Sequence, residues 1–286
     1  MQTNDTLSAR LFNQSVNIKQ IQDICKQASQ AILTIYAKQN HQVNFKSDGS
    51  PVTNADLASH EIITRSLQTL TASWPVLSEE AADIPYSERS LWDTYWLVDP
   101  LDGTKAFVNR TDDFSINIAL ISQHRPVFGM VYIPVQDLCY FGGSLFHGAW
   151  RQRSNEDPLS ITTASCHLGE RVTIVISRNM SEQDMPELFK QLRYYFTKIR
   201  IIESAGAIKG CMVADGSADI YPRPGTTCEW DTAAFQAIVE AAGGQVVDSQ
   251  GKVLEYNKKA DLFNSDFYVT GDLLPEWKQL ILQLSR

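Results

Sequence analysis

The chain has 286 residues, of which 43% are hydrophobic, and its net charge is −8. This length favours two domains and is ample for a large core. The acidic balance, with no basic run longer than two residues, argues against binding to a nucleic-acid polymer.

Signals for membrane insertion or secretion are absent from the sequence pattern. No apolar stretch approaches the roughly 20 residues that span a bilayer, and residues 1–5 do not begin a signal peptide. The five cysteines are scattered and include no C-x-x-C pair, so neither a disulfide framework nor a zinc site is indicated. We expect a cytoplasmic protein, with peripheral attachment to the cytoplasmic face of the inner membrane left open, and a monomer or a homodimer.

Two helices are predicted at the start of the chain. Isoleucine and alanine recur at three- and four-residue steps over 15–39, which indicates an amphipathic helix. A polar loop is expected over 44–51. Thr53 or Asn54 then caps a second helix that continues to Leu70.

The region from Trp74 to Trp150 is mostly strands separated by turns, which favours an antiparallel meander. The expected strands are 76–78, 95–98, 114–121, 127–133, 138–141 and 148–151.

Strands and helices alternate in the rest of the chain. The expected strands are 172–176, 199–202, 218–221, 245–247 and 267–269, and the expected helices are 182–192, 207–213, 230–242 and 273–284. The polar stretch 151–168 places the domain boundary near 155–168. We therefore predict an α+β domain over 1–155, followed by an α/β domain over 156–286.

The most informative motif lies at 96–105 and reads Trp-Leu-Val-Asp-Pro-Leu-Asp-Gly-Thr-Lys. An apolar strand leads to Asp99, Pro100 should end the sheet pairing because it lacks an N–H, and Gly103 allows a sharp bend. Glu79 and Glu80 end another apolar strand upstream. Two unit charges about 4 Å apart repel by roughly 4 kcal/mol at an effective dielectric of about 20. These carboxylates therefore favour a bound cation, and oxygen ligands suit Mg²⁺ or Ca²⁺ rather than zinc.

Two other interpretations of this motif are weaker. Asp102-Gly103 alone is a common turn dipeptide, but the whole motif with its strand and its upstream glutamates is much rarer. Phosphatases with a nucleophilic aspartate place two aspartates two residues apart. Here the spacing is three, so the side chains would not share one face of a regular strand.

Together the motifs resemble the inositol monophosphatase superfamily of Mg²⁺-dependent, Li⁺-sensitive small-molecule phosphatases. The resemblance rests on Asp-Pro-Leu-Asp-Gly-Thr at 99–104, on Trp-Asp with small residues at 230–234, and on the glutamate pair. Similarity covers most of the chain after about residue 15, and it implies a layered αβαβα sandwich of the inositol monophosphatase and fructose-1,6-bisphosphatase type. The branch most similar to this chain is that of the bacterial 3′(2′),5′-bisphosphate nucleotidases, because Lys105 stands where inositol monophosphatases usually have a threonine.

The resemblance implies a site for two or three Mg²⁺ ions. Glu79, Asp99 and the backbone carbonyl of Leu101 would hold one ion, and Asp99, Asp102 and Asp231 would hold a second. Taken alone, Asp231 would pass as an ordinary acid in the first turn of a helix.

The resemblance also implies catalytic groups. Thr104 and Asp56 would activate the attacking water, and the backbone N–H groups of Gly103 and Thr104 would bind the phosphate. Without the resemblance, Asp56 would be interpreted as a first-turn helix acid.

Substrate contacts are expected from the motif and from the second half of the chain. Gly206 precedes a helix whose amides could face a nucleotide. Lys209 and Arg223 match cations that related nucleotidases carry near the substrate, and Arg178 is a weaker candidate for the same pocket. The full expected set is Glu79, Leu101, Asp102, Gly103, Thr104, Lys105, Gly206, Lys209, Arg223 and Asp231.

Three positions depart from the family pattern. Ala106 replaces a common glutamate, Asn179-Met180 stands where a Ser-His pair is frequent, and Glu229 would add a negative charge beside the metal site. These departures bear on which substrate the protein binds, and they leave the expected metal ligands and catalytic residues unchanged.

The implied reaction is hydrolysis of the 3′-phosphate of adenosine 3′,5′-bisphosphate (PAP), with its phosphosulfate PAPS as a further candidate, to AMP and phosphate. Such an enzyme would clear a by-product of sulfate assimilation. Inositol monophosphatase or fructose-1,6-bisphosphatase activity on the same scaffold is the alternative. A non-catalytic metal- or nucleotide-binding homologue is disfavoured because the sequence lacks none of the expected metal ligands.

Overall fold

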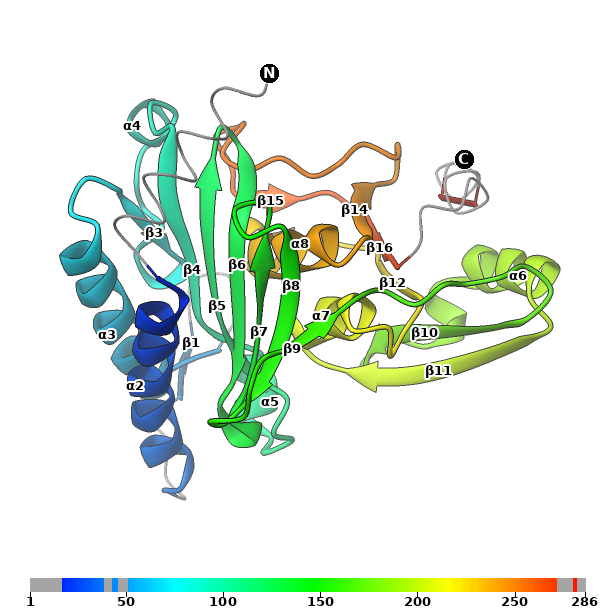
Figure 1. The fold of residues 1–286 in the computed structure, drawn as a ribbon, viewed down its shortest axis with the longest axis horizontal. Helices are drawn as coiled ribbons and strands as arrows, with labels where there is room; N and C mark the ends of the chain where they lie inside the picture. Colours follow the sequence, from blue (N-terminus) through cyan, green and yellow to red (C-terminus); the bar gives the residue numbers. More distant parts are fainter. Residues whose placement is uncertain (1–16, 39–42, 46–50, 272–279, 282–286) are drawn as a thin grey trace.

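The computed structural model describes residues 17–38, 43–45, 51–271 and 280–281. Five layers follow one another across the molecule (Figure 1): a helix pair, a seven-stranded sheet, a second helix pair, a five-stranded sheet and an outer helix. This arrangement confirms the predicted αβαβα sandwich. No helix of the described part is both long and apolar enough to cross a membrane.

The first layer contains the two helices expected from the N-terminal periodicity, α2 (Ile18–Tyr36) and α3 (Asn54–Leu70). Asn17 caps α2, and Thr53 caps α3 with Asp56 as the reciprocal capping partner. The loop predicted over 44–51 is partly wrong, because β1 (Val43–Phe45) and β2 (Pro51–Thr53) pair as antiparallel strands. Residues 46–50 lie outside the described part.

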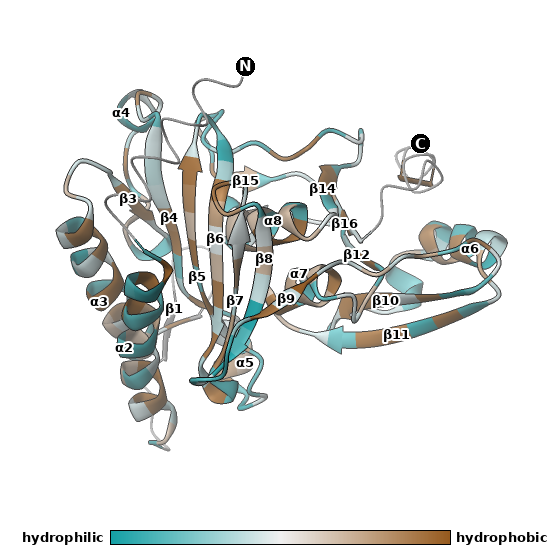
Figure 2. Ribbon diagram, in the orientation of Figure 1, coloured by the Kyte–Doolittle hydropathy of each residue, from teal (hydrophilic) through white to brown (hydrophobic). Residues whose placement is uncertain are grey.

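The first sheet contains the predicted meander and one further strand, β9 (Leu159–Ile161), that the sequence pattern did not indicate. Its strands lie in the order of the chain: β3 (Val76–Ser78), β4 (Thr94–Asp102), β5 (Ser115–Ser122), β6 (Arg125–Ile133), β7 (Leu138–Gly143), β8 (Gly148–Arg153) and β9 (Leu159–Ile161). All neighbours are antiparallel except β3 and β4, which run parallel. Every residue of β5 is buried, because helices cover both faces of the sheet. Figure 2 shows that much of β5 is hydrophobic, in keeping with this burial.

The second sheet has the order β11 (Lys198–Ser204), β10 (Arg171–Ser177), β12 (Ile220–Arg223), β16 (Phe267–Thr270) and β14 (Gln245–Asp248). Helix α6 (Pro186–Tyr195) packs on its outer face, and α7 (Ile208–Ala214) and α8 (Glu229–Ala241) lie between the two sheets. The helix expected at 182–192 is interrupted at Met185, because a 3₁₀ turn ends there and Pro186 begins α6. Most of the helix expected at 273–284 lies outside the described residues.

Short elements complete the described part and escaped the sequence patterns. They are 3₁₀ turns at Glu79–Ala81 and Pro134–Gln136, helices α4 (Tyr86–Arg89) and α5 (Thr104–Val108), and the strand pair β13 (Thr227–Cys228) with β15 (Phe263–Asn264). Two of them adjoin the carboxylate site: the 3₁₀ turn at Glu79–Ala81 begins with Glu79, and α5 begins at Thr104.

Helix α8 packs directly on the first sheet, where Gly129 of β6 makes room for it. A Cβ on Gly129 would lie 1.9 Å from the carbonyl oxygen of Ala234. The core between the sheets contains residues from both halves of the chain, including Leu97, Val131, Phe235 and Val269. The close approach of α8 brings the start of this helix to the end of β4. The division into domains at 155/156 stays a prediction.

Candidate active site

The carboxylate motif forms a β-bulge, which differs from the predicted end of pairing at Pro100. Asp99 lies opposite Asn117 of β5, and Asp102 lies opposite Ser115, so two residues of β4 face one residue of β5 between these pairs. The bulge absorbs the proline that cannot donate to the ladder. It also changes the side-chain alternation, so that two aspartates spaced by three residues converge on the same side.

Three carboxylates meet at this bulge. Asp99, Asp102 and Asp231 each offer an oxygen within 4.8 Å of the others. Asp99 is only 1% exposed. Burial, together with the charges of Glu79, Asp102 and Asp231, raises the pKa of Asp99 well above its usual range, and Glu79 is also hydrogen-bonded to it. Acids from three separate segments of the chain, at 79, 99–102 and 231, therefore come together.

Local hydrogen bonds orient the acids of this cluster. Leu101 N–H donates to Asp99 Oδ1 over 3.0 Å. Asp231 lies in the first turn of α8, and its Oδ2 accepts from Cys228 N–H over 2.8 Å. Burial and the neighbouring Asp102 raise the pKa of Asp231 to about 8. A group of carboxylates that repel one another in this way is suited to a hard divalent cation with oxygen ligands.

The stability of the metal-free protein should depend on pH because of this cluster. The pKa values of Asp99 and Asp231 are raised in the folded state, so the folded protein holds protons that the unfolded chain releases above about pH 4. We expect the melting temperature in EDTA to fall by several degrees as the pH rises from 5 to 8, and saturating Mg²⁺ to remove most of this fall.

Asp231→Asn is the control for this pH effect, because it removes one of the two titrating groups. Burial also raises the pKa of Glu229 to about 7, so Glu229 adds to the fall in stability as the pH rises. Asp231→Asn keeps Glu229, so the variant should show a smaller fall than the wild type rather than none. A metal-free wild type whose melting temperature is as high at pH 8 as at pH 5 would contradict the prediction.

The structure brings Thr104 and Asp56 together beside the cluster. Thr104 Oγ1 lies 3.1 Å from Asp56 Oδ1, to which it donates, and 3.3 Å from the Leu101 carbonyl oxygen. The other Asp56 oxygen accepts from Thr53 N–H at 2.7 Å and Thr53 Oγ1 at 2.6 Å. Burial raises the pKa of Asp56, while the Thr53 hydrogen bonds act in the opposite direction. Asp56 thus both caps α3 and orients the Thr104 hydroxyl.

The turn between β4 and α5 requires glycine. Gly103 has a φ of +89°, and a Cβ there would lie 2.9 Å from the Asp113 carbonyl oxygen. The backbone can therefore bend back on itself between the Asp102 side chain and the start of α5.

A cleft of about 480 Å³ opens above the carboxylates. Residues of the motif line one side, and the opposite wall comes from the second half of the chain. The predicted substrate residues that line it are Glu79, Asp102, Gly103, Thr104, Lys105, Gly206, Lys209, Arg223 and Asp231, and Arg178 also lines it. Leu101 is buried behind them.

Lys209 and Arg223 differ in how the protein holds them. Lys209 is 3% exposed, donates to the Gly206 carbonyl over 2.9 Å and lies 5.0 Å from the centre of the Tyr221 ring. Burial lowers its pKa to about 8. Arg223 Nη1 lies 3.8 Å from the neutral sulfur of Met180. One of the three departures from the family pattern thus contacts a cation of the cleft.

Sequence reasoning missed two partners of Asp102. Asn117 Nδ2 donates to Asp102 Oδ2 over 3.1 Å, and the N–H of Ala207 donates to the same oxygen. Gly206 permits this approach, because a Cβ there would lie 2.5 Å from Asp102 Oδ2. Asn117 lies in the apolar strand β5, whose pattern is typical of a buried core strand. Only the presence of a polar side chain in such a strand could have indicated that Asn117 contacts the site.

Glu229 does not add its charge to the cluster, so the corresponding expectation is wrong. Both carboxylate oxygens accept from Asn257 N–H over 2.9 Å, and Arg89 supplies a nearby positive charge. Asn257 Oδ1 in turn accepts from Arg89 over 2.5 Å. The side chain is buried, and its contacts are with Asn257 and Arg89 rather than with the carboxylate cluster. Ala106 is buried in α5 and also lines the cleft.

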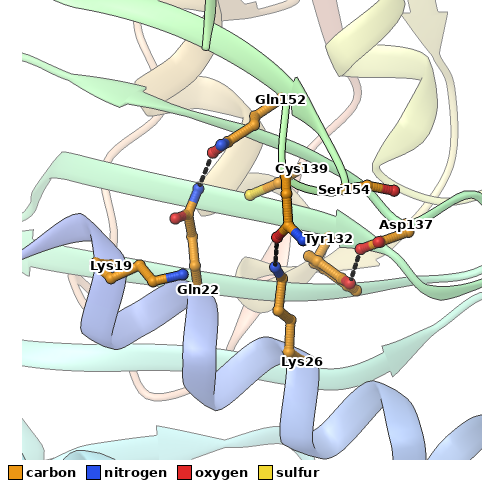
Figure 3. A pocket seen from close by; sticks show the side chains of 9 residues that line it. Lys19, Gln22, Lys26, Tyr132, Asp137, Cys139, Gln152 and Ser154 are labelled. Carbon is orange, nitrogen blue, oxygen red and sulfur yellow. Dashed lines mark hydrogen bonds between the residues drawn. The ribbon is translucent and has the colours of Figure 1, made fainter. Parts of the chain in front are cut away.

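A second hollow, drawn in Figure 3, lies between α2 and the strands β6 to β8 and does not resemble a substrate site. Its volume is about 20 Å³, which is room for about one water molecule. Gln22 is hydrogen-bonded to Gln152, and Tyr132 to Asp137, across it. The carboxylate cleft is the candidate active site, because among the described residues it combines the acid cluster with Lys209 and Arg223.

The layered fold and its acidic cleft define a class of metal-dependent phosphatases. A model of the inositol monophosphatase family matches residues 13–286, and the chain belongs to this family. Among structures, the Thermotoga maritima inositol monophosphatase aligns with a TM-score of 0.72 at 20% identity, over 92% of this chain and 95% of the other.

Within the family, several relatives with 32–41% identity to this chain are named 3′(2′),5′-bisphosphate nucleotidase CysQ. The 3′(2′),5′-bisphosphate nucleotidase CysQ of Salmonella typhimurium is 41% identical over 256 residues, which cover 88% of this chain and 99% of the relative. The CysQ of Haemophilus influenzae is 32% identical, with 96% and 98% covered. The crystal structure of CysQ from Bacteroides thetaiotaomicron aligns with a TM-score of 0.73 at 35% identity, over 87% and 94% of the two chains.

Proposed function

We propose that this chain is a Mg²⁺-dependent 3′(2′),5′-bisphosphate nucleotidase that hydrolyses the 3′-phosphate of PAP to AMP and phosphate. The observation that carries the proposal is the cleft, in which a converging acid cluster faces a wall with Lys209 and Arg223. Relatives named as CysQ nucleotidases, 32% and 41% identical, support the same activity.

The proposed metal ligands are Glu79, Asp99, Asp102, Asp231 and the Leu101 carbonyl. When bound, Mg²⁺ neutralises the phosphoryl oxygens and lowers the pKa of a coordinated water. The chain contributes ligands that are already oriented: Asp231 by Cys228 N–H, and Asp102 by Asn117 and Ala207. This orientation lowers the reorganisation needed during the reaction.

Thr104 is proposed to position the attacking water. Because its hydroxyl donates to Asp56, its oxygen lone pairs are free to accept a hydrogen bond from water in the cleft. Asp56 in turn receives two hydrogen bonds from Thr53, which hold the carboxylate in place. The N–H groups of Gly103 and Thr104 are proposed to bind the phosphate.

The opposite wall is proposed to recognise the nucleotide. Lys209 and Arg223 supply positive charge against the bisphosphate, Gly206 borders the cleft next to Asp102, and Lys105 stands at its exposed edge. We further propose that the enzyme works in the cytoplasm as a monomer or homodimer, and that residues 156–286 form a second domain that completes the active site and substrate pocket of domain 1–155.

A substrate panel tests the proposed function. Phosphate release is measured from PAP, PAPS, inositol 1-phosphate and fructose 1,6-bisphosphate with Mg²⁺, with and without Li⁺. We expect kcat/KM to be highest for PAP and Li⁺ to inhibit. A preference for inositol 1-phosphate or fructose 1,6-bisphosphate would refute the nucleotidase assignment, and no release from any compound would favour a non-catalytic homologue.

Thr104 provides a matched pair of variants. Thr104→Ala should lower kcat for PAP by about 10²-fold or more, since a positioned proton-transfer group contributes on that scale. Thr104→Ser keeps the hydroxyl and should retain most of the activity. Equal losses in the two variants would show that the methyl group, rather than the hydrogen bond to Asp56, is what matters.

A further inference from the structure

An ion pair lies at the edge of the cleft, and the proposed chemistry does not use it. Arg178 Nη2 is paired with Asp113 Oδ2. Arg178 directly follows β10 in the second sheet, and Asp113 comes just before β5 in the first sheet. The Arg178 side chain is 41% exposed and lines the cleft, while Asp113 is 19% exposed. The pair therefore joins the two sheets beside the substrate space.

The backbone holds Asp113 firmly against the proposed phosphate-binding turn. Its carbonyl oxygen packs where a Cβ of Gly103 would lie, 2.9 Å away. The segment before it turns through left-handed conformations at Arg110 (φ 56°) and Asp112 (φ 63°). The Asp113 backbone consequently packs against this turn and places the carboxylate at the edge of the cleft, where it pairs with Arg178.

Arg178 is held differently from the other cations of the wall. Lys209 is buried and tied to the Gly206 carbonyl, and Arg223 contacts the neutral Met180 sulfur. Arg178 is exposed and its partner is a carboxylate. A phosphate carries more charge than a carboxylate and can accept two parallel hydrogen bonds from a guanidinium. A phosphate entering the cleft can therefore compete for Arg178.

We propose that Arg178 is a specificity residue for the substrate phosphate that is not hydrolysed, and that Asp113 holds the guanidinium when this phosphate is absent. Binding of the second phosphate exchanges Asp113 for the phosphate as the partner of Arg178. A substrate with one phosphate leaves the Arg178–Asp113 ion pair intact, so Arg178 contributes nothing to the binding of that substrate. This inference rests on the proposed nucleotidase function, because it needs a substrate with two phosphates.

The test compares PAP with adenosine 3′-monophosphate, which lacks only the second phosphate. The readout is the ratio of kcat/KM for PAP to kcat/KM for the monophosphate. Arg178→Ala should lower this ratio by about tenfold or more, the scale of a hydrogen bond to a charged group. Asp113→Asn should raise the ratio severalfold, because the competing carboxylate is gone. In the double variant, Asp113→Asn should produce no further rise.

Arg151→Ala is the matched control. Arg151 is 44% exposed and pairs with Asp215 over 3.3 Å, outside the residues that line the cleft. Its loss should leave the ratio unchanged. Equal losses for both substrates in Arg178→Ala, or a lower ratio in Asp113→Asn, would overturn the inference while leaving a working nucleotidase. A wild type that releases no phosphate from either nucleotide would instead overturn the proposed function, and this inference with it.

Discussion

Replacing Asp99 with asparagine should lower Mg²⁺-dependent phosphate release by about 10³-fold or more, while the melting temperature without metal stays the same or rises. Asp99 is proposed to be shared by two metal ions, and it lies at the centre of the acid cluster. Asparagine has nearly the same shape, so the bulge should persist. It lacks the charge, so repulsion with Asp102, Asp231 and Glu79 decreases in the metal-free protein.

The measurements are phosphate release, Mg²⁺ titration and thermal unfolding with and without EDTA. Asp93→Asn serves as the control, because it makes the same substitution just before β4, at an exposed position. It should change neither activity nor melting temperature. Near-normal turnover by Asp99→Asn would refute its assignment as a metal ligand.

Gly129→Ala should destabilise the protein by about 3 kcal/mol or more and impair the active site as well, although Gly129 lies in the core. The new methyl group would lie 1.9 Å from the Ala234 carbonyl oxygen and within 3 Å of two further atoms of that residue. All three atoms are backbone, so α8 itself must move. Asp231 lies three residues earlier in the same helix. We therefore expect a lower melting temperature and a higher Mg²⁺ concentration for half-maximal activity.

Gly169→Ala is the comparison for this variant. It adds a methyl group to open space, where only the left-handed φ of +80° opposes it. Its cost should be about 1 kcal/mol, with no change in the Mg²⁺ requirement. If Gly129→Ala melted at the wild-type temperature and kept the wild-type Mg²⁺ dependence, the packing of α8 on β6 would not set the position of Asp231.

Periodicity predicted most of the fold because most elements have one regular apolar face. The helices α2, α3, α7 and α8 and the strands β3 to β8 of the first sheet lie where the pattern indicates, whereas β9 falls in the polar stretch that was expected to separate two domains. Residue propensity did not predict the irregular elements. Pro100 was expected to stop β4, but the neighbouring pairs with Asn117 and Ser115 hold the strand in register through a bulge. Tertiary pairing thus overrode a local signal.

The candidate site was predictable where its residues are close in the sequence or belong to a motif. The contacts that orient those residues were not. Asp102 and Ala207 are 105 positions apart, and the hydrogen bond between them depends on how the second sheet packs against the first. Glu229 was misplaced for a similar reason, because its direction is set by Asn257 in a distant loop. A residue type indicates what a side chain can do, whereas the fold decides which way it points.

The hydrogen bond from Ala207 to Asp102 has a thermodynamic consequence. One carboxylate serves both the proposed metal site and the backbone that leads into α7 on the nucleotide side. A shift of the Asp102 carboxylate on metal binding would therefore also move the backbone at Ala207, and the reverse holds for nucleotide binding. By reciprocity, the factor by which Mg²⁺ alters nucleotide affinity must equal the factor by which nucleotide alters Mg²⁺ affinity. Evolutionary changes at Gly206 or Ala207 that broaden the substrate range would accordingly also shift the metal concentration at which the protein works.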